Sequence, residues 1–387
     1  MSVNKILHVV DSYHPQLGYQ EVFLAKTHSM LGYKVSVLTS NINFDFPYYN
    51  FTVKNLLGPQ KLQSGIFYDG DVKIFRLRGI KLPKGGAWLI GFKNIIAEFD
   101  PDVVICHGVT SFNSLRIASI KKEFNFKLVY DIHMHYAIMT RSLASFYRLY
   151  KFFIKKVILK NADKVVAISH ETKRFANEVY GIPLEHIDVI PLGADIKRFA
   201  PSLQKRKKIR EKLGIKSNDV CLIYAGKVIP EKGVDWIIKA GLRLLKKHKN
   251  VQFLILGDGP PWYLNSLHAM VPKKLKQHFV FHKTVLNAEL PDFYNACDVG
   301  VWPKEVTITT IEAMSCGLPV IVSSLPVAIE RIRYNNGFSV SSIDELYKAM
   351  LFFVENPDKR VEMGKNSRMA CETELNWESI AKRFLEL

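Results

Sequence analysis

Short runs of β-branched residues alternate with segments of helical period along the whole chain, and no other feature constrains the fold as strongly. This alternation is typical of parallel sheets with helices on both faces, in which ligands bind at the carboxyl ends of the strands. The pattern predicts helices over residues 19–31, 110–123 and 234–247. It predicts strands over residues 5–10, 34–39, 103–106, 127–131 and 164–168 in the first half, and over residues 220–224, 251–256, 279–281, 298–301 and 319–322 in the second.

The length of 387 residues suits two domains, and the composition, 48% hydrophobic and 23% charged, excludes extended disorder. We place the boundary after the segment Ile190-Pro-Leu-Gly-Ala-Asp195, because residues 197–216 are polar and basic, as in an exposed linker and first helix. The predicted domains are residues 1–195 and 196–387. We expect the last helix, residues 375–387, to cross back to the first domain.

The charge balance favours anionic ligands. Lys and Arg number 54 against 36 Asp and Glu, a formal net charge of +18, which favours phosphorylated ligands, anionic lipid or nucleic acid. Five scattered cysteines without a Cys-x-x-Cys pair predict a reduced, cytoplasmic protein. The sequence has no uninterrupted apolar run of 18 residues, so we expect no membrane-spanning helix, and the opening apolar run is too short for a signal peptide.

A loop with two lysines is the first candidate for a binding site. The segment Ala225-Gly-Lys227-Val-Ile-Pro-Glu-Lys232-Gly233 follows a predicted strand and leads into a predicted helix. Glycine permits close backbone approach, and a helix N-terminus offers N–H groups to an anion. Two lysines beside that terminus suit a diphosphate, whereas a surface loop with solvated lysines is the alternative interpretation.

The second candidate lies after Trp302, where a predicted strand ends. A loop rich in hydroxyl groups follows, and the next helix carries Glu312 among apolar neighbours. A carboxylate there suits the hydroxyl groups of a ribose or a sugar, because it accepts two hydrogen bonds from a diol. Helix capping would explain the threonines but not a buried Glu312.

Together with other segments, these two resemble the retaining GT-B glycosyltransferases of the GT4 family, over nearly the whole chain. The resemblance implies an α/β GT-B fold, with two Rossmann-like parallel-sheet domains facing across a cleft. The first domain would bind the acceptor, and the second would bind a nucleotide sugar. The further matching segments are Pro101-Asp-Val-Val-Ile-Cys-His107-Gly, Val129-Tyr-Asp-Ile-His133, Ala162-Asp-Lys-Val-Val-Ala-Ile-Ser169, Val189-Ile-Pro-Leu-Gly193-Ala-Asp195, Leu256-Gly-Asp-Gly-Pro260, Cys316-Gly-Leu-Pro-Val and Trp377-Glu378.

The resemblance also assigns roles to individual residues. It implies that Lys227 and Lys232 bind the donor diphosphate, and that Glu312 holds the nucleotide ribose. His133 would lie beside the transferred sugar and, with Lys232 and Glu305, would be catalytic. The remaining residues with an implied role are Gly18, Thr309 and Thr310 for the donor, and Tyr19, Gln20 and His107 for the acceptor.

Three positions depart from the family pattern. Lys227 stands where the family usually has Arg, so a point charge replaces a bidentate fork. Gly18 is followed by Tyr19 where the family has a second glycine. The two glutamates of the family are separated by seven residues, but six separate Glu305 from Glu312, so either Glu305 or Lys304 fills the first position, and we favour Glu305.

We expect the reaction to need no metal and no cofactor, because the lysines and helix N-termini can neutralise the leaving diphosphate. Asp69-Gly-Asp71 has the form of a metal-binding Asp-x-Asp, but Asp-Gly between β-prone runs indicates a hairpin. His133 and His135 alternate along a strand end, yet no clear carboxylate or cysteine partner accompanies them. Gly257-Asp-Gly259 lacks the third glycine of a dinucleotide site, which disfavours a dehydrogenase.

The segment from Arg141 to Lys160 contains six basic and no acidic residues, with apolar residues on the opposite helix face. Such a helix suits an anionic membrane, and an ordinary surface helix is the alternative. We therefore expect a cytoplasmic protein, peripheral on the inner face of the cell membrane, with a glycan or lipid-linked acceptor.

Three functions remain in competition. The first is transfer of a hexose-type sugar from a UDP- or GDP-sugar to an acceptor hydroxyl with retention. The second is a GT-B-like nucleotide-sugar 2-epimerase, which needs no acceptor. The third, non-catalytic binding of nucleic acid, is disfavoured because no aromatic–basic motif appears.

Overall fold

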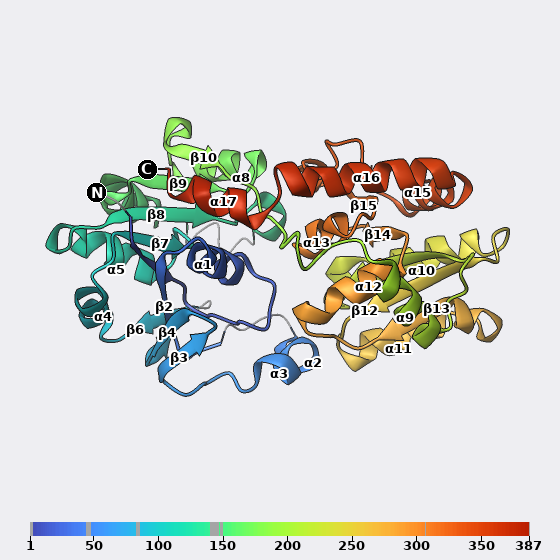
Figure 1. Ribbon diagram of the computed structural model, residues 1–387, viewed down its shortest axis with the longest axis horizontal. Helices are drawn as coiled ribbons and strands as arrows, with labels where there is room; N and C mark the ends of the chain where they lie inside the picture. The colour runs from blue at the N-terminus through green and yellow to red at the C-terminus, as the bar shows by residue number, and fades with distance from the viewer. Residues whose placement is uncertain are drawn as a thin grey trace. The chain divides into compact units, whose positions relative to one another are not determined.

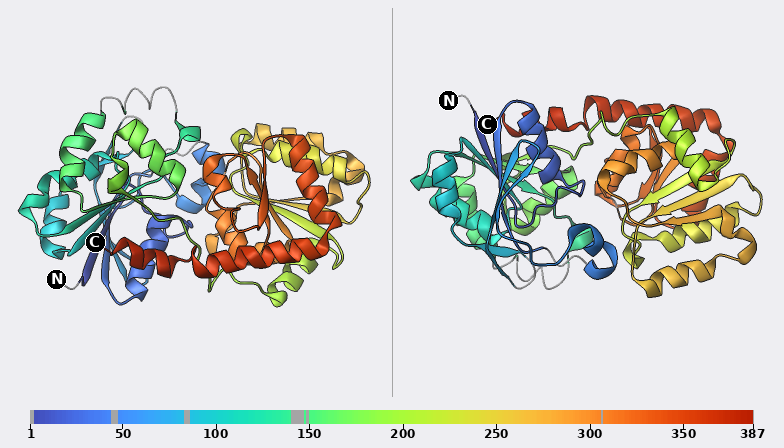
Figure 2. Two further views of the ribbon diagram at one scale, coloured as in Figure 1. Left: turned by 90° about the horizontal axis from the view of Figure 1, so that it is seen from above. Right: turned by 60° about the horizontal axis from the view of Figure 1, so that its bottom comes forward.

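The computed structural model describes residues 3–43, 48–82, 86–139, 147, 150–305 and 307–386. The chain divides into two compact units. The first comprises Met1–Phe46, Leu57–Leu192 and Trp377–Leu387, and the second comprises Pro47–Leu56 and Gly193–Asn376. Each unit contains one large sheet with helices on both sides (Figures 1 and 2).

The sheet of the first unit has eight strands in the order β10-β9-β8-β7-β1-β2-β4-β3. All neighbouring strands pair in parallel except β3 and β4. The five strands predicted in this half are present with small shifts at their ends. Strands β3 and β4 were expected only as the two arms of a hairpin at Asp69-Gly-Asp71, and β10 was not predicted. The bounds are β1 (Lys5–Val9), β2 (Lys34–Ser40), β3 (Gly65–Asp69), β4 (Val72–Leu77), β7 (Val103–His107), β8 (Lys127–Ile132), β9 (Lys164–Ala167) and β10 (Ile187–Val189).

The helices of the first unit include two from opposite ends of the chain. Helix α1 (Gln20–Met30) packs against α17 (Trp377–Phe384), and Phe23 stacks on Trp377 with ring centroids 5.7 Å apart. Arg383 donates a hydrogen bond to the Val189 carbonyl at 2.7 Å. The last helix therefore belongs to the first unit. The other helical segments are α4 (Phe92–Phe99), α5 (Phe112–Ile120), η1 (Lys121–Glu123), η2 (Tyr136–Ile138), η3 (Ile154–Ile158), α7 (Leu159–Asn161), α8 (His170–Phe175), η4 (Ala176–Tyr180) and η5 (Leu184–His186).

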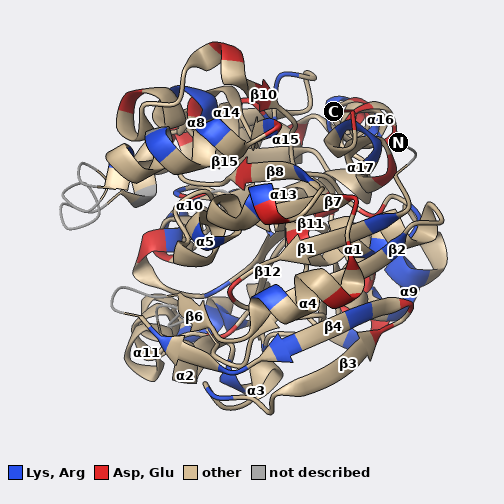
Figure 3. Cartoon of the chain, turned by 90° about the vertical axis from the view of Figure 1, so that its left-hand side faces the viewer, with Lys and Arg blue, Asp and Glu red and all other residues tan. Residues whose placement is uncertain are grey.

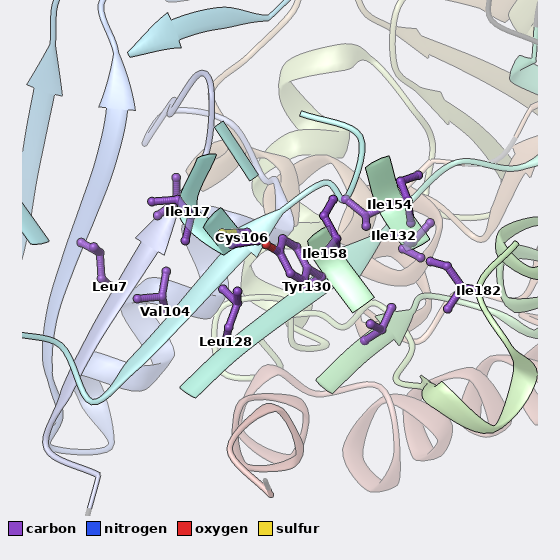
Figure 4. Close-up of a cluster of buried hydrophobic side chains, with 14 of the residues drawn as sticks. Leu7, Val104, Cys106, Ile117, Leu128, Tyr130, Ile132, Ile154, Ile158 and Ile182 are labelled. Carbon is purple, nitrogen blue, oxygen red and sulfur yellow. The ribbon is translucent and has the colours of Figure 1, made fainter. Parts of the chain in front are cut away.

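A buried apolar cluster lies between the strands of this sheet and the helical segments α5 and η3 (Figure 4). Val104 and Leu128 come from neighbouring strands, and Ile117 and Ile158 come from the two helical segments. Tyr130 in the same cluster satisfies its hydroxyl by donating to the Ser114 carbonyl at 2.8 Å. Because side chains alternate along a strand, burial of this face of the sheet determines the orientation of the side chains at the strand ends.

The hairpin prediction for Asp69-Gly-Asp71 is confirmed. Strands β3 and β4 pair antiparallel across it, and Gly70 has φ of 60° at the turn. Asp69 forms an ion pair with Lys26 at 2.9 Å. Another small antiparallel pair, β5 (Gly79–Lys81) with β6 (Ala87–Leu89), lies apart from the main sheet. Two short helices, α2 (Tyr49–Thr52) and α3 (Lys54–Leu57), precede β3.

The sheet of the second unit has six strands, all parallel, in the order β13-β12-β11-β14-β15-β16. The five predicted strands are present, and only β16 was not predicted. The bounds are β11 (Val220–Ala225), β12 (Val251–Leu256), β13 (Phe279–His282), β14 (Val299–Trp302), β15 (Val320–Ser323) and β16 (Gly337–Val340). The helical segments are α9 (Leu203–Leu213), η6 (Pro230–Lys232), α10 (Val234–Leu244), α11 (Pro261–Met270), η7 (Lys273–His278), η8 (Asn287–Glu289), α12 (Leu290–Ala296), α13 (Thr309–Ser315), α14 (Pro326–Ile329), α15 (Ile343–Glu355) and α16 (Pro357–Thr373).

The basic segment after the predicted boundary contains the expected helix, α9, and is largely exposed, but two of its arginines turn inward. Arg210 on α9 is 5% exposed and donates to the Ala296 carbonyl. It also pairs with Asp298 at 2.7 Å, and Arg206 pairs with the same carboxylate at 2.8 Å. Lys and Arg residues occur on elements of both units, including β4 and α9 (Figure 3).

The predicted basic amphipathic helix, residues 141–160, lies partly outside the described residues, which omit 140–146, 148 and 149. Within the rest, two residues of the predicted apolar face differ, because Tyr150 is buried and Phe153 is 42% exposed. Phe152 is 55% exposed, and Lys156 lies 4.2 Å above its ring. Within the described part of the chain, we find no helix of the length and apolarity needed to cross a bilayer.

We expect the Phe384→Ala variant to lose about 3–5 kcal/mol of unfolding free energy, because a fully buried aromatic ring of α17 is removed. Urea unfolding followed by circular dichroism measures the change. Met30→Ala is the control, because that side chain on α1 is 77% exposed. Equal midpoints for the two variants would show that α17 adds little to the stability of the first unit.

Candidate functional site

The predicted lysine loop leaves the carboxyl end of β11 and leads into α10. Gly233, with φ of 76°, joins the turn η6 to the helix. Lys232 is 9% exposed, and its Nζ lies 2.6 Å from Oε2 of Glu305, which follows β14. The Ala225 carbonyl accepts hydrogen bonds from Thr309 Oγ1 and Trp302 Nε1, both at 3.0 Å. The loops after two neighbouring strands therefore meet at one sheet edge.

Lys227 lies in the same loop, and its backbone carbonyl accepts a hydrogen bond from the Tyr224 hydroxyl at 2.7 Å. Burial and, to a smaller extent, the charge of Lys232 lower the pKa of Lys227 to about 8, although the Glu305 carboxylate partly offsets both effects. Two ammonium groups held close together favour a ligand with two negative charges.

Glu305 contacts the ammonium group of Lys232, whereas Lys304 contacts the backbone of the lysine loop and the helix that follows it. The ammonium group of Lys304 lies 3.5 Å from Asp235 on α10 and 5.1 Å from the centroid of the Trp236 ring. It also donates a hydrogen bond to the Pro230 carbonyl at 3.3 Å. The choice of Glu305 for the first-glutamate position stays a prediction.

Glu312 on α13 is 1% exposed, as expected for a carboxylate turned inward. Asn287 donates to its Oε1 at 2.6 Å, and the Tyr294 hydroxyl lies 3.5 Å from Oε2. Burial raises the pKa of Glu312 to about 8, and the two hydrogen bonds and the charge of Arg198 oppose that shift. A diol that donates to this carboxylate would favour its ionised form.

The threonines beside Glu312 differ in environment. The Thr307 and Thr309 hydroxyls form a hydrogen bond with each other, and Arg331 donates to the Thr307 carbonyl. Thr310 is fully buried, and its hydroxyl has no hydrogen-bond partner within the described residues. The structure thus brings the predicted donor residues of the second unit to the carboxyl ends of β11 and β14.

The predicted residues of the first unit surround Asp131, at the end of β8. His107 Nδ1 lies 2.5 Å from Oδ2 of this carboxylate, and His133 Nε2 lies 3.4 Å from Oδ1. Gln20 donates to Oδ2 at 3.3 Å, and the Gly108 N–H donates to Oδ1 at 3.0 Å. Gly18 and Tyr19 precede α1 in the loop after β1, and Tyr19 occupies the N-cap position. The donor residues Lys227, Lys232, Glu305, Thr309, Thr310 and Glu312 belong to the other unit.

Sequence reasoning assigned no role to several residues of these clusters. Asp131 was read only as part of a matching segment, although an aspartate two residues before His133 was a usable signal. Asn287, Tyr294 and Arg198 reach Glu312 from separate segments, and no local pattern connects them with it.

Within residues 3–43, 48–82, 86–139, 147, 150–305 and 307–386, no group of three or more His, Cys, Asp and Glu residues is arranged to hold a metal ion. All five cysteines are buried thiols. Independence of metals stays a prediction.

Two family descriptions match most of the chain. Residues 22–198 match "Glycosyltransferase Family 4", and residues 219–356 match "Glycosyl transferases group 1". The chain is 25% identical over 326 residues to alpha-monoglucosyldiacylglycerol synthase of Acholeplasma laidlawii, which covers 78% of this chain and 81% of that protein.

It is also 27% identical over 240 residues to the GDP-mannose-dependent monoacylated alpha-(1-6)-phosphatidylinositol monomannoside mannosyltransferase of Corynebacterium glutamicum. That match covers 58% of this chain and 61% of the mannosyltransferase, so it spans less than two thirds of that relative.

Solved structures extend the likeness to the fold of the whole chain. The sucrose-phosphate synthase of Thermosynechococcus elongatus superposes with a TM-score of 0.73 at 18% identity, covering 98% of this chain and 97% of that one. The HepE protein of Anabaena in complex with UDP gives 0.72 at 19% identity, covering 99% and 98%. The fold is that of the GT-B glycosyltransferases, which confirms the predicted fold class. The chain belongs to glycosyltransferase family 4.

We expect the Glu312→Gln variant to change how stability depends on pH. A carboxyl group whose pKa rises on folding stabilises the folded state below its unfolded pKa, near 4.5, and this contribution is lost as the pH rises through about 8. The variant has no such loss, so its unfolding free energy relative to the parent should increase between pH 5 and 8.5, by on the order of a few kcal/mol. Urea unfolding across this range measures the difference, and the exposed Glu211→Gln serves as the control. Parallel curves for Glu312→Gln and the parent would contradict the buried environment of this carboxyl.

Proposed function

We propose that the protein transfers a hexose-type sugar from a UDP- or GDP-sugar to an acceptor hydroxyl, with retention of the anomeric configuration, and that a glycan or lipid-linked molecule supplies the acceptor. One observation carries this proposal: the half-buried Lys227 and the buried Lys232, with Glu305, lie at the same sheet edge as the inward-facing Glu312. A diphosphate and a ribose diol are adjacent groups of one nucleotide-sugar molecule, and these side chains match both.

In this proposal the bond between the anomeric carbon and the diphosphate oxygen breaks as the acceptor oxygen approaches from the same face. The acceptor proton passes to a phosphate oxygen, so no protein base is needed for that step. Lys227 and Lys232 stabilise the negative charge that develops on the departing diphosphate.

Glu305 changes partner in this scheme. Without donor, its carboxylate pairs with Lys232 at 2.6 Å. A diphosphate competes for that ammonium group, because it carries more charge than one carboxylate. Glu305 then becomes available to accept hydrogen bonds from the hydroxyl groups of the transferred sugar.

The relatives support the choice of substrates. The Corynebacterium protein is named as dependent on GDP-mannose, the Acholeplasma protein as a synthase of a glycosylated diacylglycerol, and the Anabaena protein was solved with UDP. A lipid-linked acceptor would place the protein on the inner face of the cell membrane. An epimerase has no comparable support among these proteins.

A thermal-shift screen against UDP, GDP, ADP and their sugars tests donor binding. We expect one base to raise the melting temperature, since a ligand that binds only the folded state stabilises it by mass action. Lys232→Ala should abolish the shift, and the exposed Lys247→Ala should retain it. No shift with any nucleotide, or an equal shift for Lys232→Ala, would overturn the proposed donor site.

Turnover tests the reaction itself. With the matching nucleotide sugar and a lipid or glycan acceptor, NMR of the product should show the anomeric configuration of the donor, and excess EDTA should leave the rate unchanged. Conversion of the nucleotide sugar without an acceptor would instead identify an isomerase.

The charge of Lys227 makes donor binding dependent on pH. Because its pKa is lowered to about 8, the unliganded side chain loses its proton above that pH. We expect the Kd for the nucleoside diphosphate to rise about tenfold between pH 7 and 9. Lys227→Arg, which stays charged, should bind with a nearly constant Kd over this range. Isothermal titration measures both, and identical pH profiles would remove Lys227 from the diphosphate site.

A further inference from the structure

A line of buried histidines in the first unit has no part in the mechanism proposed above. His8 on β1 and His28 on α1 are both fully buried, and His107 ends β7. His28 Nε2 lies 3.0 Å from the Ala381 carbonyl on α17, and His28 Nδ1 lies 3.1 Å from His8 Nε2. His8 Nδ1 lies 3.0 Å from His107 Nε2, and His107 Nδ1 lies 2.5 Å from Asp131. The elements that carry these residues are neighbours in the sheet or pack on it (Figure 1).

The two ends of this line determine its protons. A backbone carbonyl can only accept, so His28 must carry a proton on Nε2, and its Nδ1 is left to accept. His8 must then donate through Nε2 and accept through Nδ1, and His107 must donate through Nε2. Four hydrogen bonds join three rings to two acceptors, and each bond contains one proton. Three neutral imidazoles supply three protons, so the line holds one more.

The extra proton belongs at the carboxylate end. Burial lowers the pKa of both His8 and His28, that of His28 to about 4, so neither ring favours a positive charge. Burial alone would raise the pKa of Asp131, but the charges of His107 and His133 outweigh it and hold that pKa far below its usual range. The 2.5 Å contact between His107 and Asp131 fits a proton shared by an imidazolium and a carboxylate.

The other groups around the line do not supply this proton. Gln20 and the Gly108 N–H donate hydrogen bonds to Asp131, but amide groups do not release their protons. Tyr33 meets His28 edge to face, with ring centroids 6.2 Å apart. Glu21 on α1 acts on this region only through its charge, and burial raises its pKa.

We propose that His8, His28 and His107 form a closed proton chain, anchored on the Ala381 carbonyl, which holds one extra proton against Asp131 and thereby acts as a positioning group for His133. The chain cancels most of the charge of Asp131, whose Oδ1 lies 3.4 Å from His133 Nε2. The contact with Asp131 therefore orients the His133 ring. The extra proton weakens the electrostatic effect of the carboxylate on the charge of that ring.

The consequence for His133 can be read from its titration. Burial would lower the pKa of His133, but the carboxylates of Asp131 and Glu21 outweigh burial and raise it. Without the extra proton, the chain and Asp131 together would have a net charge of −1 instead of zero. His133 would then lose its proton at a higher pH.

Nitrogen-15 NMR of the full chain tests the proton count directly. At pH 8 we expect two protonated ring nitrogens on His107, and a single proton, on Nε2, for both His8 and His28. The His107→Asn variant assigns the signals. One protonated nitrogen on His107 in the parent protein would overturn the proposal, whatever the variants do.

Two replacements of His28 test the positioning role. His28→Gln can donate to Ala381 and accept from His8, so it should leave the titration midpoint of His133 in place. The His28→Leu variant cannot donate to the Ala381 carbonyl. His8 can then carry its proton on Nδ1 and donate to His107 Nε2, and His107 can donate to Asp131 through Nδ1. Without the extra proton, His107 should be neutral. The midpoint of His133 should then rise by about one pH unit or more. An unchanged midpoint in a folded His28→Leu variant, or an equal rise in both variants, would overturn it.

The importance of this chain for turnover rests on the proposed function, but the NMR readouts do not. Donor binding by the second unit, measured by thermal shift, reports on the proposed function separately. If the protein bound no nucleotide but the NMR spectra showed the predicted number of protons, only the proposed function would be contradicted.

Discussion

Because almost all strands of the two sheets run parallel, each connection must return along the outside of its sheet, and the loops that follow the strands gather at one edge. In the second unit this brings the loop after β11 beside the loop after β14, which is why Lys232 can meet Glu305. In the first unit the ends of β7 and β8 place His107 and Asp131 in contact. The chemistry of each unit depends on this alignment of strands.

In the second unit, burial shifts the pKa values of a lysine and a glutamate in opposite directions. Burial favours the neutral form of Lys227 and the neutral form of Glu312, and it moves the pKa of each to about 8. A ligand that brings two phosphates to the lysines and a diol to the carboxylate would restore both charges. The unliganded site is therefore prepared for one particular distribution of charge and hydrogen-bond donors.

The parts of this structure that could be predicted are those with a local signal. Continuous apolar runs such as Val220–Ala225 identify buried parallel strands, and the Asp69-Gly-Asp71 turn identifies a hairpin. Strand β3 has only exposed and half-buried residues, so the neighbouring turn was the one signal that indicated it. Asn287 and Tyr294 reach Glu312 only through tertiary packing, and His8 within an apolar strand looks like an ordinary core residue until its neighbours are known.

The return of α17 to the first unit has a consequence for biosynthesis. During translation, most of the first unit is synthesised long before the helix that supplies the Ala381 carbonyl, and His28 has no acceptor there until that helix has been made. A fragment that stops at the boundary between the units would keep that defect permanently. Native assembly of the first unit therefore depends on α17 and is completed only after that helix has been synthesised.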